Sequence, residues 1–332
     1  MTKRQYLKMV IKMDKIMVLF LILLVGCSST GKVVEDAVPR ENSKEIGVYF
    51  CPQDDCEKVL IDVIDSASKK VHCALFDIDL KDLIKAIGAK SHEVEVKLVV
   101  DDENYGEIKG PGVRKDTSSQ FSHNKFCVID GKMITTGSMN PTDNGANKNN
   151  NNLLVIYSKY LAVNYEDEFE ELWNGSFGEG SSVKYPTIYF NGKEIENYFC
   201  PEDDCAERII EEINDAEKSV YFMTFSFTNE DIADALLFND KIDIKGLFEK
   251  VGAGSQYSQY GRLRDFGLDV RLDTNPATMH HKVFIIDNET VITGSMNPTG
   301  AGDHKNDENI LIIHDKKVAE GFVEEFNHLF GE

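Results

Sequence analysis

The sequence predicts an α/β fold, a mixed α+β sandwich in which two tandem repeats pack about a pseudo-two-fold axis and share one site. Two observations predict it: strand-like apolar runs alternate with helix-like amphipathic segments, and the same series of segments occurs twice. With 332 residues, 42% of them hydrophobic, the chain can bury the core of one large domain or of two packed half-domains.

Each repeat opens with Tyr-Phe-Cys-Pro and continues with a helix, a strand, a second helix with further strand material, a hairpin, and a closing strand with an acidic amphipathic helix. In chain order the matching segments are 49–52 and 198–201, 59–64 and 209–213, 71–76 and 220–227, 83–100 and 232–270, 123–140 and 280–297, and 161–173 and 318–330. Equivalent residues are 149 positions apart at the cysteines and 157 apart at the histidines, so the second repeat carries eight additional residues between them. We therefore expect repeat one at 46–173, a linker at 174–197 and repeat two at 198–332.

The N-terminal segment has the pattern of an export signal. Basic residues up to Lys15 precede an apolar run at 16–25 that is too short to span a bilayer. Residues 24–27, Leu-Val-Gly-Cys, resemble the lipobox of bacterial and archaeal lipoproteins, which implies cleavage before Cys27 and lipidation of its sulfur. We expect a signal peptide at 1–26, a flexible tether at 27–45, and an extracytoplasmic protein that is anchored to the cell membrane through Cys27.

Six further cysteines would then lie in an oxidising compartment. Two matching Cys-x4-Cys pairs, 51 with 56 and 200 with 205, are far apart in sequence and contain no histidine, which favours two local disulfides over a metal site. Cys73 and Cys127 lie in apolar strand-like runs, and we expect them to be buried thiols.

The formal net charge of −21 bears on the class of substrate. Such a charge repels polyanions at long range, so an anionic substrate must be drawn by a local basic patch. This weakens the hypothesis of a processive nucleic-acid-binding protein, although it does not exclude a nuclease. Two short segments could supply basic and aromatic contacts to a nucleic acid, residues 109–115 and 257–264.

The strongest motif is His-x-Lys, which occurs once in each repeat as His123 with Lys125 and His280 with Lys282. Alternate residues of a strand point to the same face, so each histidine should project with its lysine. In both repeats an Asp follows the Lys after five residues, and Gly-Ser-x-Asn follows the Asp after seven. A hairpin turn at the Asp would bring the Ser and Asn beside the His-Lys pair. These further candidates are Asp130, Ser138 and Asn140 in repeat one, and Asp287, Ser295 and Asn297 in repeat two.

This set of side chains suits attack on phosphorus. One neutral imidazole can act as the nucleophile, and one protonated imidazole can give its proton to the leaving oxygen, so both repeats are needed. The lysines and asparagines can donate hydrogen bonds to the non-bridging oxygens, and the serines can bind the phosphate or fix a neighbouring side chain. The mechanism needs no metal and no cofactor.

These residues resemble the signature of the phospholipase D superfamily, His-x-Lys-x4-Asp-x6-Gly-Ser-x-Asn, which both repeats match in full. The stretch 279–297 looks most like the branch that contains mitochondrial cardiolipin hydrolase and small bacterial endonucleases. The resemblance implies one shared site, a phosphohistidine intermediate and hydrolysis by water, with Asp130 and Asp287 in structural or proton-tuning roles. It also favours His123 as the nucleophile and His280 as the general acid.

The two repeats differ at one position after the signature. Family members often carry an acidic residue there: Glu308-Asn309 fits in repeat two, but repeat one has Asn151-Asn152. The two halves are therefore not expected to be equivalent. His281 should face the opposite side of its strand and serve the structure.

Three functions compete. The first is a phospholipase that hydrolyses phospholipid phosphodiester bonds, and the second is an extracytoplasmic endonuclease that cleaves DNA or RNA by the same chemistry. The third is a surface binding protein that keeps the fold without activity, against which the two intact signatures argue. Because one chain holds both half-sites, we expect an active monomer.

Overall fold

The computed structural model describes residues 38–106, 108, 110, 112–239 and 241–331. The expected signal peptide and the lipidated Cys27 lie outside the described residues. Within them, the helices are too short or too polar to cross a bilayer.

Repeat one forms a seven-stranded sheet with the strand order β2-β8-β7-β6-β3-β4-β5. Its strands are β2 (Gly47–Cys51), β3 (Lys70–Leu75), β4 (Glu95–Val100), β5 (Val113–Lys115), β6 (Lys125–Ile129), β7 (Met133–Gly137) and β8 (Asn151–Ile156). Its helices are α2 (Cys56–Asp65), α3 (Lys81–Lys90), α4 (Asp143–Asn147) and α5 (Lys159–Asn174).

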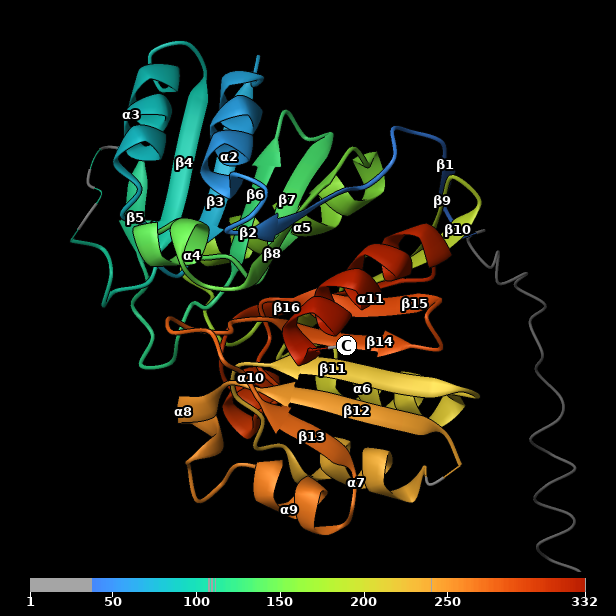
Figure 1. Ribbon diagram of the computed structural model, residues 1–332. Helices are drawn as coiled ribbons and strands as arrows, with labels where there is room; N and C mark the ends of the chain where they lie inside the picture. The colour runs from blue at the N-terminus through green and yellow to red at the C-terminus, as the bar shows by residue number, and fades with distance from the viewer. Residues whose placement is uncertain (1–37, 107, 109, 111, 240, 332) are drawn as a thin grey trace, which may run out of the picture. The chain divides into compact units, whose positions relative to one another are not determined.

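Repeat two forms a nine-stranded sheet with the order β1-β9-β10-β16-β15-β14-β11-β12-β13. Its strands are β1 (Arg40–Glu41), β9 (Thr187–Phe190), β10 (Lys193–Cys200), β11 (Ser219–Thr224), β12 (Asp243–Phe248), β13 (Asp269–Leu272), β14 (Lys282–Ile286), β15 (Thr290–Gly294) and β16 (Glu308–Ile313). Its helices are α6 (Cys205–Asp215), α7 (Glu230–Phe238), α8 (Lys250–Ala253), α9 (Tyr260–Asp265), α10 (Gly300–His304) and α11 (Lys316–Phe330). Both repeats share one arrangement, which confirms the predicted fold class (Figure 1).

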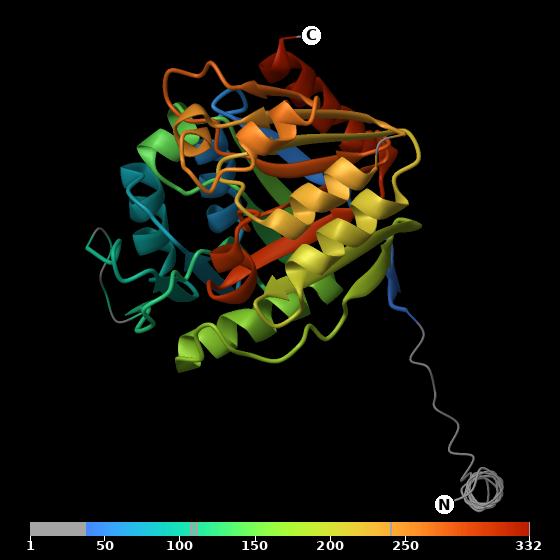
Figure 2. The same ribbon diagram turned by 90° about the horizontal axis from the view of Figure 1, so that it is seen from below.

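Helices cover both faces of each sheet. The pair α2 and α3 packs together on the outer face of the first sheet, and α6 with α7 does the same on the second (Figure 2). On the inner faces, α5 packs on β6 and β7 and reaches β10, while α11 packs on β14 and β15 and reaches β2. The largest apolar cluster therefore joins the two repeats, with Tyr165 and Phe169 from α5 and Phe322 and Phe326 from α11 fully buried within it.

Local sequence accounts for the ends of these elements. Ser158 caps α5 by accepting a hydrogen bond from the Leu161 N–H, and Gly175 ends the helix with a φ of 93°. The hairpin β6–β7 turns at Asp130 and Gly131, whose φ angles of 54° and 63° belong to the left-handed region that Asp-Gly turns favour. This turn is the one predicted from the sequence.

The disulfides correct part of the cysteine prediction. Cys51–Cys56 and Cys200–Cys205 are bonded as expected. Cys73 and Cys127 are not thiols, because they form a third disulfide. They stand directly opposite each other where β3 pairs antiparallel with β6. The two cysteines are 54 residues apart, so the sequence pattern alone does not show that they are neighbours.

Two segments are more ordered than expected. The C-terminal part of the predicted linker forms β9 and the start of β10, because Ile188, Phe190 and Ile195 alternate toward the core and are buried. The end of the predicted flexible tether forms β1, which pairs in parallel with β9. Both segments therefore belong to the second sheet.

Candidate active site

The two repeats meet where each His-x-Lys motif begins. The N–H of His123 donates to the carbonyl oxygen of Asp307 (3.0 Å), and the N–H of His280 donates to the carbonyl oxygen of Asn150 (2.8 Å). Each histidine therefore enters its strand from a backbone contact with the other repeat. Asp307 and Asn150 directly precede the position at which the two repeats differ, which places Glu308 and Asn151 at the junction.

Glu308 of repeat two holds the imidazole of repeat one. The Nδ1 atom of His123 lies 2.8 Å from each carboxylate oxygen of Glu308. Both side chains are buried, with exposed fractions of 7% for His123 and 0% for Glu308. Burial lowers the pKa of His123 well below its ordinary value and raises that of Glu308 to about 8. Burial therefore disfavours charge on both members of this pair in the resting site.

Asn151 of repeat one holds the imidazole of repeat two. Its side-chain oxygen lies 2.9 Å from Nδ1 of His280 and also accepts the hydroxyl of Ser138 at 3.0 Å. The Asn151 amide nitrogen donates to the carbonyl oxygen of Gly145, which fixes the direction of the amide. Because an amide oxygen only accepts, His280 must carry its proton on Nδ1, and its Nε2 atom points toward Lys282 (3.2 Å).

The two motif lysines are buried beside the imidazoles. Lys125 donates to the carbonyl oxygen of His123 (2.5 Å), and Lys282 to that of His280 (2.9 Å). Burial lowers the pKa of Lys125 to about 7, against the opposing effect of Glu308 and other nearby carboxylates. Burial and the charge of Lys125 lower the pKa of Lys282 well below its ordinary value. Burial therefore disfavours positive charge on these lysines in the empty site, and a bound anionic phosphodiester would favour it again.

Burial also lowers the pKa of His280 well below its ordinary value. The positive charges of Lys282 and Lys125 lower it further. Burial consequently favours the neutral form of both imidazoles. An anion between the lysines would offset this effect and favour protonation.

Sequence reasoning missed two aromatic residues that support the site. The ring of Phe76 lies 4.8 Å from that of His123, and the ring of Phe225 lies 4.7 Å from that of His280. The ammonium groups of Lys125 and Lys282 lie 5.1 Å and 5.2 Å from the same two rings. The repeat offers a signal for this pair, because the two phenylalanines are 149 positions apart, as the cysteines are.

The predicted phosphate-binding serines and asparagines lie at the junction too. Ser138 and Ser295 are fully buried, and their hydroxyls accept the N–H groups of Asn152 (3.0 Å) and Asn309 (2.9 Å). They thereby hold the backbone next to Asn151 and Glu308. The side-chain oxygens of Asn140 and Asn297 are buried and have no hydrogen-bond partner among the described residues.

The motif aspartates lie elsewhere. Asp130 is in the turn after β6, roughly 20 Å along the strand from His123 at about 3.3 Å per residue. Its carboxylate accepts the N–H groups of Ser68, Lys69 and Lys70, and Asp287 accepts those of Glu217, Lys218 and Ser219. Burial alone would raise the pKa of Asp130, but these donors outweigh it and lower the pKa. The structure therefore favours the structural role and not contact with a substrate.

A buried polar network continues the junction behind the imidazoles. His281 faces away from the site, with Nδ1 3.1 Å from the amide of Asn152 and Nε2 3.3 Å from Glu325 on α11. At the equivalent place, Asn309 donates to Asn124 (2.7 Å), whose own amide donates to Glu168 on α5. Asn152 and Asn309 each reach into the opposite repeat and thereby fix the relative position of the two half-sites.

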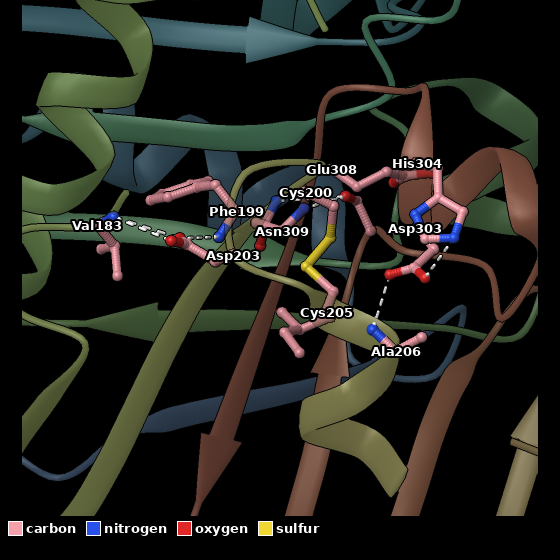
Figure 3. Close-up of a disulfide and its surroundings, with 12 residues drawn as sticks. Val183, Phe199, Cys200, Asp203, Cys205, Ala206, Asp303, His304, Glu308 and Asn309 are labelled. Atoms are coloured by element: carbon pink, nitrogen blue, oxygen red, sulfur yellow. Dashed lines mark hydrogen bonds and ion pairs between the residues drawn. A yellow bond between two sulfur atoms is a disulfide. The ribbon is translucent and has the colours of Figure 1, made fainter. Parts of the chain in front are cut away.

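The two matching disulfides lie beside the residues that hold the imidazoles. In the strand pairing, Cys200 stands opposite Glu308 and Cys51 opposite Asn151. Figure 3 shows the Cys200–Cys205 disulfide next to Glu308, with Asp203 accepting the Phe199 N–H (3.0 Å) in the same turn. The repeated Cys-Pro-x-Asp-Asp-Cys segments thus support the ends of β8 and β16.

Two groups of side chains among the described residues have the composition of a metal site. They are His72 with Glu166 and Glu170, and Glu194 with Glu196 and His314. Neither group contains a motif residue, and in the first Lys70 already pairs with Glu166 at 2.5 Å.

Comparison with known proteins identifies related sequences and folds. A family profile described as "Cardiolipin synthase, PLD-like domain" matches residues 60–173 and again 209–330. A phospholipase D of Rickettsia typhi is 31% identical over 134 residues, which cover 40% of this chain and 66% of that protein. A mitochondrial cardiolipin hydrolase of Xenopus laevis is 33% identical over 135 residues, which cover 39% of this chain and 63% of that protein. This chain thus aligns with just under two thirds of the length of these two relatives.

Two solved structures are similar as well. Nuc of Salmonella typhimurium, titled a phospholipase D family member, is 32% identical and covers 42% of this chain and 95% of its own, with a TM-score of 0.41. A phosphatidylserine synthase of Haemophilus influenzae is 14% identical and covers 85% of both chains, with a TM-score of 0.63. The latter shows that the arrangement of both repeats is shared with a solved fold.

Proposed function

The chain belongs to the phospholipase D-like family of phosphodiesterases, and from this membership we propose that it hydrolyses phospholipid phosphodiester bonds through a covalent phosphohistidine, without a metal ion. One observation supports the mechanism above others. Each imidazole is held at Nδ1 by the opposite repeat, so that Nε2 is left for chemistry, and only one of the two holding groups, the Glu308 carboxyl, can carry a negative charge.

His123 is the nucleophile in this proposal. The lone pair of its Nε2 atom attacks phosphorus, a P–N bond forms, and the P–O bond to the leaving group breaks. The ring then carries a positive charge, which the Glu308 carboxylate at 2.8 Å from Nδ1 stabilises. Asn151 cannot stabilise such a charge on His280 to the same extent, because an amide is neutral.

His280 is the general acid. The Nδ1–H of its protonated ring donates a hydrogen bond to Asn151 and stays on the ring. The proton on Nε2 passes to the leaving oxygen. In the second step the neutral ring takes a proton from water, the water oxygen attacks phosphorus, and the P–N bond to His123 breaks. A neutral partner suits this role because it lets the proton leave easily.

The lysines supply the electrostatic stabilisation. A phosphodiester anion restores the positive charge that burial disfavours on Lys125 and Lys282. Their ammonium groups can then donate to the non-bridging oxygens, on which negative charge accumulates in the transition state. Binding and protonation of the site are therefore coupled.

The choice of a phospholipid as substrate has separate support. The net charge of −21 disfavours a polyanion, and relatives carry the names phospholipase D and mitochondrial cardiolipin hydrolase. We further propose that Cys27 carries the lipid that anchors the protein outside the cytoplasm, and that the monomer is active because one chain contains both histidines.

The test is an assay of the purified protein in EDTA on phosphatidylcholine and cardiolipin vesicles, in parallel with single-stranded DNA and RNA. We expect head-group or phosphatidic acid release from lipid and intact polynucleotides. His123→Ala and His280→Ala are the matched controls and should abolish the release. Cleavage of polynucleotide alone would replace the phospholipase with a nuclease, and loss of activity in EDTA would overturn the metal-free mechanism.

A further inference from the structure

Large apolar side chains are exposed beside the active site. Val251 and Tyr257 have exposed fractions of 77% and 69%, and Phe121 and Leu272 of 42% and 41%. We call these four residues the apolar rim. Exposed apolar side chains mark a site of association where they border one site and are not scattered singly.

Three of the four residues lie on the side of His280. Helix α8, which carries Val251, begins after β12, where the Glu249 N–H donates to the carbonyl oxygen of Thr224 at the end of β11. Gly252 packs so closely on Phe225 that a Cβ atom would lie 2.6 Å from the Phe225 carbonyl oxygen. Phe225 in turn contacts the imidazole of His280. The short helix therefore borders the site directly.

Leu272 and Tyr257 continue this border. Leu272 ends β13, and the next residue, Asp273, accepts the N–H of Lys250 at the start of α8 (3.0 Å). Tyr257 lies between α8 and α9, in the segment where repeat two is eight residues longer than repeat one. Figure 1 shows α8 at the same end of the second sheet as α10 and the start of β14.

Phe121 provides the apolar rim on the side of His123. Its ring lies 5.3 Å from that of Phe76 and 6.5 Å from that of His123. Exposed apolar side chains therefore lie on the sides of both imidazoles, Phe121 in repeat one and the other three residues in repeat two.

The charges nearby favour a neutral or zwitterionic surface over a nucleic acid. Asp101 and Asp116 lie buried before Phe121, and burial raises the pKa of Asp101 to about 6, with a further contribution from Asp116. In the segment 257–264, which could have bound a nucleic acid, Arg262 pairs with Asp234 and Arg264 with Asp265. The basic residues of this segment are thus already neutralised by carboxylates.

We propose that the apolar rim inserts into the surface of a zwitterionic phospholipid bilayer and seats the mouth of the active site on it, so that one lipid's phosphodiester can reach the imidazoles. This inference rests on the proposed function. Apolar side chains that enter the boundary between head groups and acyl chains bind by the area they bury, without the need for anionic lipid.

The test compares a soluble with a vesicular substrate. All proteins are the full chain with Cys27→Ser, which excludes an acyl anchor. They carry an intact rim, Val251→Glu, Tyr257→Glu, or both rim substitutions. A control variant is Phe238→Glu, which alters an 81% exposed side chain at the end of α7, outside the apolar rim. Co-sedimentation with phosphatidylcholine vesicles and hydrolysis of the vesicles are measured beside hydrolysis of monomeric dihexanoyl-phosphatidylcholine.

We expect each rim substitution to reduce vesicle binding and vesicle hydrolysis roughly tenfold, and the pair about a hundredfold. Hydrolysis of the monomeric lipid and the Phe238→Glu control should be unchanged. Unaltered vesicle binding would overturn the inference, as would an equal loss on the monomeric lipid. If the protein with an intact apolar rim hydrolyses neither lipid, the proposed function fails. Co-sedimentation alone then still decides whether the apolar rim binds a bilayer.

Discussion

Substitution of Glu308 by Gln distinguishes the roles of the two imidazoles most sharply. The change keeps the shape of the side chain and an oxygen that can accept the Nδ1 proton of His123, but it removes the negative charge. Both imidazoles would then be held by amides, because Asn151 already occupies the equivalent place beside His280. Any kinetic difference therefore reports the charge of Glu308.

The magnitude follows from the contact. A carboxylate about 3 to 4 Å from a cationic ring contributes on the order of 4 kcal/mol at an effective dielectric constant near 20, and a neutral hydrogen bond from Gln restores about 1 kcal/mol. A loss of about 3 kcal/mol from the transition state for attack corresponds to a rate decrease of roughly 150-fold. The fold should be unaffected, because Gln fills the same buried space.

The assay uses p-nitrophenyl phosphorylcholine in single-turnover mode. Its leaving group needs no proton, so release of p-nitrophenolate reports attack by His123 alone. We expect a decrease of roughly 150-fold for Glu308→Gln and less than tenfold for the matched variant Asn151→Asp. A Glu308→Gln protein with an unchanged melting temperature and a release rate within threefold of wild type would refute the assignment of His123 as the stabilised nucleophile.

Three further predictions concern charge and stability. Because burial lowers the pKa of Lys125 to about 7, kcat/KM on the soluble diester should fall as the pH rises above about 7, and an unchanged value up to pH 9 would contradict this. Asp130→Asn should lower the free energy of unfolding in urea by about 3 kcal/mol at pH 7, with little change in activity per folded molecule. Since hydrogen bonds lower the pKa of this aspartate in the folded state, the difference should shrink below about pH 4, whereas a constant difference would count against the assignment. Replacing Cys73 and Cys127 together by Ala should cost about 3 to 4 kcal/mol in the same assay, and no loss would mean that the disulfide does not form.

The sequence was informative wherever the two repeats could be compared. Two His-x-Lys motifs with one spacing predicted a pair of half-sites. The alternating strand pattern predicted that Lys125 lies beside His123, and Asp130-Gly131 predicted the hairpin turn. These features depend on neighbours within a few residues, where periodicity and turn preferences apply. The difference between Glu308 and Asn151 was also visible in the alignment of the repeats.

The remaining features depend on contacts between distant segments. Glu308 lies 185 residues from His123, and its pairing with the histidine of the other repeat follows only from the crossing of the backbone at Asp307. The Cys73–Cys127 disulfide depends in the same way on the register of β3 against β6. The register of strand pairing sets such contacts, and the pattern of a single sequence does not specify which distant strands pair.

The most direct measurement is the mapping of the covalent intermediate. The protein is mixed with a phosphodiester substrate, quenched within one turnover under alkaline conditions that preserve phosphohistidine, and digested for mass spectrometry. The proposed mechanism predicts an adduct on His123 that accumulates in His280→Ala with the p-nitrophenyl substrate and is absent from His123→Ala. An adduct on His280, or full turnover by His123→Ala, would contradict it.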